Sequence, residues 1–299
     1  MNTFIQGVTG NPTVFLNGEL TPLSEAKISV LDRGFIFGDG IYEVVPIYAG
    51  KPFRMDNHLD RLARSLKKLR IESPYTREEW VDLVQTLLQT MLQTSVAQMC
   101  MVYLHITRGV AKRDHAFPLP AVKPTVFAMV APMSRPTVAA REQGLTAVSI
   151  DDVRWLLCDI KSISLLGNVL AKQAAVDAQV DEVVQFRNDF LTEGASCNIW
   201  VVKQGTLYAP PNDNLILEGI RYGLLQELCQ QEGIPFVVGP VSRQAVSSAD
   251  ELMMSSATRE VLPIVQLDGK PVGLGQPGPI YQKLRRAYDE AIEALTASE

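Results

Sequence analysis

Several pairs of short apolar runs in this chain are joined by two-residue turns whose second residue is glycine. Asn17-Gly18 stands between two such runs, and Ala49-Gly50, Gln204-Gly205 and Asp268-Gly269 follow the same pattern. Turns of this kind predict antiparallel β-hairpins. Strands that are not each followed by a helix argue against a doubly wound parallel sheet. The chain is therefore predicted to have an α+β fold.

Helix signals interrupt these strands. Leucines recur at helical spacing between residues 59 and 69, and Thr76 with Glu79 forms a capping box that predicts a second helix. Residues 108–124, rich in charge and proline, are expected to form a long exposed loop. Strands are expected at residues 100–107, 125–131, 181–186, 198–203, 206–209, 235–238 and 252–256, and helices at residues 165–179, 221–231 and 280–295.

The chain has 299 residues, which is enough for about two domains with cores of their own. The best linker candidate is residues 132–136, because a proline at each end of this segment resists regular structure. We therefore expect an α+β domain over residues 1–131 and a second α+β domain over residues 137–299.

Composition excludes some classes of function. The net charge is −5 without clustered acidic residues, which argues against nucleic acid or an anionic membrane as the main partner. Neither a signal peptide nor an apolar run long enough to span a bilayer is visible. The three histidines show no metal-ligand spacing, so no metal is expected. The four scattered cysteines indicate reduced thiols in a cytoplasmic protein.

Lys161 is the first candidate for chemistry, because it lies in a mostly apolar run over residues 153–168. Desolvation disfavours the charge of a lysine and leaves a neutral amine, which is a nucleophile able to form a Schiff base with an aldehyde cofactor. The alternative from spacing alone is a strand-end lysine whose amine reaches solvent.

Four other segments combine glycine or small residues with charged groups. Residues 32–44 contain three glycines but no GxGxxG pattern before a helix, so a tight turn into a strand is the simplest interpretation. Residues 191–198 place Glu193 in a turn of small residues, which by itself predicts a hairpin. Residues 217–223 lead into a helix whose amides would suit a phosphate, although ordinary helix entry fits as well. Residues 254–260 offer hydroxyls after a strand, a second possible anion site.

Together these features match the needs of one cofactor, pyridoxal 5′-phosphate. It requires an amine for its aldehyde, a carboxylate for its ring nitrogen and a dry cradle for its phosphate. A carboxylate beside the ring nitrogen keeps it protonated, and a protonated ring withdraws electrons from the α-carbon of the substrate.

With these segments the sequence resembles the class IV aminotransferases, which form the fold-type IV branch of pyridoxal-phosphate enzymes. Within that family it is most similar to the D-amino-acid transaminases. The resemblance runs from about residue 14 to the last helix. Its most specific stretches are residues 32–43, 57–62, 108–118, 154–162 and 192–194.

The resemblance implies roles for the matching residues. Lys161 would hold the cofactor as a Schiff base and move the substrate proton, Glu193 would pair with the ring nitrogen, and Leu217 would pack against the ring. Tyr42 and Val44 would line the substrate site near Lys161. The phosphate would be bound by Arg61, by the amides of Ile220 and Arg221, and by Ser256 and Ala257.

Arg113 and His115 carry the resemblance to the D-amino-acid branch. They would trap the substrate carboxylate from the neighbouring subunit of a homodimer, although a solvated basic loop is the simpler interpretation of the residues alone. A transfer from D-amino acids of the D-alanine type to 2-oxo acids such as 2-oxoglutarate or pyruvate is therefore expected. The alternatives are a branched-chain L-amino-acid or (R)-amine transaminase and, less favoured, an aminodeoxychorismate lyase.

Three residues depart from the family pattern. Arg221 and Ala257 stand where threonine is common, and Arg259 stands where a small residue is usual. We expect the phosphate to be bound with fewer hydroxyl contacts, and therefore the cofactor to be lost more readily.

Overall fold

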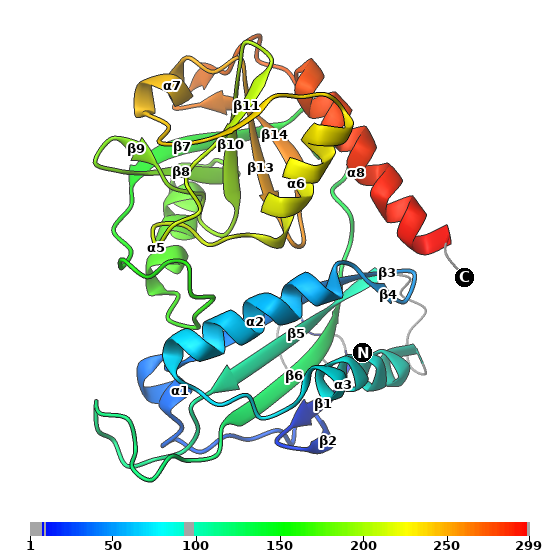
Figure 1. Ribbon diagram of the computed structural model, residues 1–299, viewed down its shortest axis with the longest axis vertical. Helices are drawn as coiled ribbons and strands as arrows, with labels where there is room; N and C mark the ends of the chain where they lie inside the picture. The colour runs from blue at the N-terminus through cyan, green and yellow to red at the C-terminus, as the bar shows by residue number, and fades with distance from the viewer. Residues whose placement is uncertain (1–7, 9, 93–98, 298–299) are drawn as a thin grey trace. The chain divides into compact units, whose positions relative to one another are not determined.

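A computed structural model describes residue 8, residues 10–92 and residues 99–297 (Figure 1). The chain divides into two compact units. Unit 1 comprises residues 1–134 with residues 160–164, and unit 2 comprises residues 135–159 with residues 165–299. The division after Ser134 falls inside the segment expected to be a linker.

Residues 160–164 belong to unit 1, whereas Lys161 is expected from the sequence to lie in the second domain. Main-chain hydrogen bonds explain the difference. The Tyr42 amide donates to the Lys161 carbonyl at 3.0 Å, and the Ile163 amide donates to the Gly40 carbonyl at 3.1 Å. The segment thus pairs with a strand of unit 1, and this long-range pairing leaves no local sequence signal.

In the described part of unit 1, six strands form an antiparallel sheet in the order β2-β1-β6-β5-β3-β4. These strands are β1 (Thr13–Leu16), β2 (Glu19–Pro22), β3 (Gly40–Tyr48), β4 (Lys51–Pro52), β5 (Met99–Thr107) and β6 (Thr125–Pro132). The helices are α1 (Arg33–Phe37), α2 (Met55–Leu69) and α3 (Arg77–Leu92). The predicted turns at Asn17-Gly18 and Ala49-Gly50 are confirmed, with positive φ at all four residues.

Helices α2 and α3 cover the sheet of unit 1 (Figure 1). Leu59, Leu62 and Leu66 of α2 are buried against the sheet, which confirms the predicted leucine stripe. The capping box is also confirmed, because the Thr76 amide donates to Glu79 Oε2 at 2.7 Å and the Glu79 amide donates to Thr76 Oγ1 at 3.2 Å. Local sequence chemistry thus marks both helices, and their buried side chains pack in one core with the strands.

The segment at residues 32–44 is more than the expected tight turn. Asp32 caps the short helix α1 by accepting from the Gly34 amide at 2.8 Å, and Gly38 ends the helix with φ 66°. A Cβ on Gly40 would lie 2.3 Å from the Ile106 carbonyl oxygen, so only glycine permits β3 to begin there. The glycines thus serve a helix end and a close strand contact.

The described residues of unit 2 contain a nine-stranded mixed sheet, ordered β12-β11-β10-β13-β14-β7-β8-β9, with β15 paired to β14. Its strands are β7 (Leu145–Asp151), β8 (Glu182–Arg187), β9 (Phe190–Leu191), β10 (Asn198–Lys203), β11 (Thr206–Ala209), β12 (Phe236–Val238), β13 (Glu251–Ser256), β14 (Glu260–Leu267) and β15 (Lys270–Pro271). Its helices are α4 (Val138–Glu142), α5 (Leu166–Asp177), α6 (Ile220–Gln231), α7 (Arg243–Ser247) and α8 (Pro279–Ala297).

Helices also cover the sheet of unit 2 (Figure 1). Ala171 and Ala175 of α5 are buried in a cluster with Val183 of β8, and α6 and α8 contact β13. Trp200 of β10 is fully buried beside Tyr222 of α6, with ring centroids 5.0 Å apart. The predicted hairpins at Gln204-Gly205 and Asp268-Gly269 are confirmed. Both units mix helices with mainly antiparallel strands, so the α+β prediction is correct.

Candidate active site

Lys161 lies beside β3, the first strand of substantial length in unit 1. Its amide is 3.3 Å from Ser65 Oγ of α2, and its Nζ lies 4.1 Å from the centre of the Tyr42 ring. The side chain is half-buried, between the buried residues Ile160 and Ser162. The backbone of this segment is thus fixed on two sides, while the amine lies over an aromatic face.

Alternation along β3 separates two sets of side chains. Glu43 is fully buried and faces the core with its neighbours of the same parity, whereas Tyr42 and Val44 are partly exposed on the other side. The Tyr42 ring also approaches the Tyr103 ring, at 5.8 Å between centroids. The structure therefore brings Tyr42 to Lys161 and places Val44 on the same strand face.

Arg61 is held by a buried carboxylate that the sequence analysis does not single out. Its Nε and Nη2 donate to the two oxygens of Glu43 at 2.7 and 2.8 Å, and His58 Nδ1 lies 2.8 Å from Glu43 Oε2. Burial opposes the charge of Glu43, yet Arg61 and His58 hold the pKa of this carboxyl well below its usual range. Arg61 is thus a fixed, buried cation and not a solvated helix arginine.

The loop that carries Arg113 and His115 is anchored by another buried arginine. Arg33 donates through Nη1 to the Asp114 carbonyl at 2.5 Å and through Nε to Asp39 Oδ2 at 2.8 Å. Arg113 and His115 are exposed, and both side chains lie near the Phe37 ring. The loop therefore has a defined backbone and presents this pair at the surface of unit 1.

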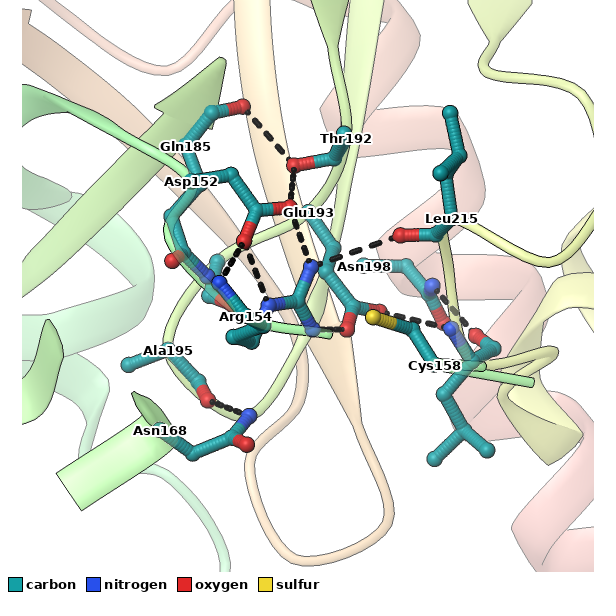
Figure 2. Close-up of polar contacts among 12 residues, drawn as sticks. Asp152, Arg154, Cys158, Asn168, Gln185, Thr192, Glu193, Ala195, Asn198 and Leu215 are labelled. Atoms are coloured by element: carbon teal, nitrogen blue, oxygen red, sulfur yellow. Dashed lines mark hydrogen bonds and ion pairs between the residues drawn. The ribbon is translucent and has the colours of Figure 1, made fainter. Parts of the chain in front are cut away.

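In unit 2, Glu193 is buried within a network of charged groups that Figure 2 shows. Its Oε1 accepts from Arg154 Nη1, and its Oε2 accepts from the Leu217 amide at 3.0 Å. Burial raises the pKa of the Glu193 carboxyl, while Arg154 and the Leu217 amide act in the opposite direction. Asp152 binds the other edge of Arg154, at 2.9 Å to Nε and 2.8 Å to Nη2.

Ile220 and Arg221, whose amides are expected to bind the phosphate, are the first two residues of α6. Gly219 is the N-cap residue and offers no side-chain cap, and a Cβ there would lie 2.2 Å from Asn198 Oδ1. Arg221 is buried, and its Nη2 donates to the Ala257 carbonyl at 3.1 Å. The structure thus joins the helix start to the turn after β13.

The turn after β13 is also tied to β8. The Arg259 amide donates to Ser256 Oγ at 3.1 Å, and Arg259 Nη1 donates to Glu182 Oε2 at 2.9 Å. Glu182 is buried and accepts from the Ala195 amide through its other oxygen at 3.1 Å. The charge of Arg259 is therefore paired with the buried carboxylate of Glu182.

The predicted residues are divided between the units. Unit 1 brings Lys161 next to Tyr42, and unit 2 brings Glu193 to Leu217 and Arg221 to Ala257. The charged partners Arg33, Glu43, Asp152 and Arg154 have no role predicted from the sequence. Glu43 has a detectable signal, since a carboxylate at a core-facing parity of an apolar strand requires a partner.

The donor set fits pyridoxal phosphate. The chain offers a lysine amine over an aromatic ring, a buried carboxylate with one neighbouring cation, and a glycine-capped helix start of the kind that binds phosphate. Within the described residues, no cluster of histidine, cysteine or carboxylate side chains fits a metal ion. The described helices include none that is long and apolar enough to cross a membrane.

Comparisons with known proteins agree with this chemistry. Residues 40–267 match the family model described as amino-transferase class IV. The chain is 41% identical to a D-alanine aminotransferase of Staphylococcus haemolyticus, over 95% of this chain and 99% of that protein. It is 36% identical to a D-alanine aminotransferase of Bacillus licheniformis, over 95% and 98% of the two chains.

Solved structures of aminotransferases have a similar fold. A branched-chain amino acid aminotransferase of T.th., solved with pyridoxamine 5′-phosphate, superimposes with a TM-score of 0.87 and 25% identity over 95% of both chains. The branched-chain enzyme of Escherichia coli superimposes with a TM-score of 0.86 and 24% identity over 94% of both chains. The chain belongs to the class IV aminotransferases and is a pyridoxal-phosphate-dependent enzyme of fold type IV.

Proposed function

We propose that this enzyme transfers the amino group of D-amino acids, with D-alanine as the type, to 2-oxo acids such as 2-oxoglutarate or pyruvate. The observation that carries the proposal is the anchored loop that exposes Arg113 beside His115. A planar guanidinium binds a carboxylate in a fixed direction, and this direction selects which face of the α-carbon is deprotonated. The D-alanine aminotransferases at 36% and 41% identity support the same substrate class.

Each residue of the proposed site would have its own role in the reaction. Bound pyridoxal phosphate supplies an electron sink for the α-carbon of the substrate. Lys161 would hold the cofactor through its amine and then carry the proton that leaves the α-carbon. Glu193 would hold the proton of the ring nitrogen, and Leu217 would pack against the ring. Tyr42 and Val44 would line the substrate side of β3.

The phosphate would be bound largely by fixed donors. Arg61, fixed by Glu43, would supply a guanidinium, and the start of α6 would supply the amides of Ile220 and Arg221. Ser256 and Ala257 would complete this set from the turn after β13. The bond from Arg221 to the Ala257 carbonyl supports this part of the proposal, because it joins two of the binding segments.

The proposed enzyme is a homodimer in which the loop carrying Arg113 and His115 serves the neighbouring subunit. Exposed apolar side chains, grouped in short stretches of the sequence on each unit, support this assembly, because burying them in an interface would be favourable. On unit 1 they are Ile28, Val30, Leu31, Phe35, Val110, Phe117 and Leu119, and on unit 2 Val153, Trp155, Leu156, Leu157, Leu166, Val169 and Leu170. A cytoplasmic location is proposed because all four cysteines are buried free thiols.

A steady-state panel tests the substrate assignment. D-alanine, L-leucine and (R)-1-phenylethylamine are compared as amino donors with 2-oxoglutarate as the acceptor. The proposal predicts the highest kcat/KM for D-alanine. A preference for L-leucine would instead assign the branched-chain activity for which the similar solved structures are named. Release of pyruvate from aminodeoxychorismate without any acceptor would assign the lyase activity.

A further inference from the structure

Arg154 lies between two buried carboxylates in unit 2. Its side chain is 5% exposed, and those of Asp152 and Glu193 are 0% and 7% exposed. One edge of the guanidinium, Nε and Nη2, binds Asp152, while Nη1 points to Glu193 Oε1 (Figure 2). A single guanidinium therefore neutralises Glu193 from a position fixed by a second anion.

Asp152 is itself held from several directions. Thr192 Oγ1 donates to Asp152 Oδ2 at 2.9 Å, and Arg187 Nη2 lies 3.2 Å from Asp152 Oδ1. Arg187 also donates to the Arg154 carbonyl at 2.7 Å. On another side, a Cβ on Gly167 of α5 would lie 2.8 Å from Arg154 Cγ. Arg154 therefore occupies a closed position, with little freedom to move away from Glu193.

The charge of Glu193 depends on the position of Arg154, because the Glu193 carboxylate is buried away from water. Its backbone is paired with β8, where the Gln185 amide donates to the Glu193 carbonyl at 2.9 Å. Its carboxylate accepts from Arg154 through one oxygen and from the Leu217 amide through the other. A buried carboxylate without a nearby cation takes up a proton, and a neutral acid cannot stabilise a protonated ring nitrogen.

We propose that Arg154 is a positioning residue that keeps Glu193 ionised and fixed, so that Glu193 can hold the proton on the cofactor's ring nitrogen. Asp152 in turn fixes Arg154. This inference rests on the proposed role of Glu193. The titratable and charged groups of unit 2 that act on Glu193 include Arg154, Asp152 and Cys158, which lie in one loop, and Cys197.

The test measures directly whether the cofactor's ring nitrogen is protonated. Protein is loaded with pyridoxamine 5′-phosphate labelled with ¹⁵N in the ring, and the ¹⁵N chemical shift reports protonation at neutral pH. Affinity for the same ligand is measured by fluorescence titration. Wild-type protein is expected to show a protonated nitrogen. Arg154→Met is expected to show an unprotonated nitrogen and an affinity at least about tenfold weaker, the factor that corresponds to one unit of pKa.

Matched variants separate charge from general disruption. Arg154→Lys retains a cation and is expected to retain the protonated nitrogen. Arg243→Met removes a surface arginine of the same unit that pairs with Asp151 and Asp189 instead of with this network. It is expected to keep the wild-type shift and an affinity within about twofold, because a fixed Arg154 remains. Asp152→Asn, which loosens Arg154, is expected to fall between wild type and Arg154→Met.

The outcomes distinguish two failures. If wild-type protein does not bind the ligand or leaves its ring nitrogen unprotonated, the proposed function of Glu193 fails. If wild type binds a protonated ring and Arg154→Met does the same with unchanged affinity, the role of Arg154 is overturned. Should Arg154→Met not fold, Arg154→Gln and Asp152→Asn carry the same comparison, and a wild-type shift in both would equally overturn it.

Discussion

Glu43→Gln is predicted to destabilise unit 1 strongly, although the substitution hardly changes the volume of the side chain. Glu43 is fully buried, and its two oxygens bind Arg61 at 2.7 and 2.8 Å beside His58. Glutamine keeps the volume, so no cavity forms, but it removes the charge that faces a buried guanidinium. Breaking one partner of such a pair typically costs about 3–5 kcal/mol.

The effect also has a predicted pH dependence. Despite its burial, Glu43 has a pKa held well below the usual value by Arg61 and His58, so in acid the unfolded chain binds a proton that the folded chain does not. The stabilisation is therefore fully present at neutral pH. It declines as the pH falls below about 4.3, the ordinary pKa of glutamate. The difference between wild type and Glu43→Gln should shrink in acid.

Native-state hydrogen exchange measures this locally, because peptides from β3 and α2 report the opening of unit 1 separately from unit 2. Asp60→Asn is the matched control. Asp60 also lies on α2 and pairs with Arg77 at 2.8 Å, but this pair is exposed and should contribute at most about 1 kcal/mol. Equal losses of protection in Glu43→Gln and Asp60→Asn at neutral pH would refute the reasoning.

Three further predictions concern the substrate, the cofactor and a helix end. Arg113→Ala should raise KM for D-alanine more than KM for an amine without a carboxylate. The control Lys112→Ala, which removes the adjacent exposed cation, should change neither KM. Equal effects of Arg113→Ala on both substrates would reject the proposed carboxylate trap. Ala257→Thr, by adding a hydroxyl, should slow cofactor loss in dialysis after a turnover cycle by about three- to tenfold; full retention by the wild-type enzyme would contradict the premise. Thr76→Ala should reduce the stability of α3 by about 1 kcal/mol in hydrogen exchange, and unchanged protection would show that its capping bonds contribute nothing.

Local chemistry explains why much of the fold is predictable. The Asn17-Gly18 turn and the Thr76–Glu79 capping box each act over a few residues, so their patterns are complete within the sequence. The short helix α1 escapes prediction because a five-residue helix has too few turns to show a period. Asp32, which caps it, has the sequence signature of an ordinary turn.

The charged partners of the site are harder to predict because they meet across long sequence separations. Arg33 reaches the carbonyl of Asp114, and Arg154 reaches Glu193. No local pattern links such residues, since their pairing is decided by sheet order and loop packing. The pairing of residues 160–164 with β3 is of the same kind. Resemblance to a family supplies roles for the reacting residues, and the structure supplies the residues that position them.

The most direct test of the account is the location of the cofactor's covalent link. The purified enzyme is reduced with borohydride, digested, and mapped by mass spectrometry, with Lys161→Ala as the control. We predict a single modified peptide, with the cofactor's mass on Lys161, and no modified peptide from the variant. A cofactor found on another lysine of the wild-type enzyme, or full labelling of Lys161→Ala, would contradict the assignment of Lys161.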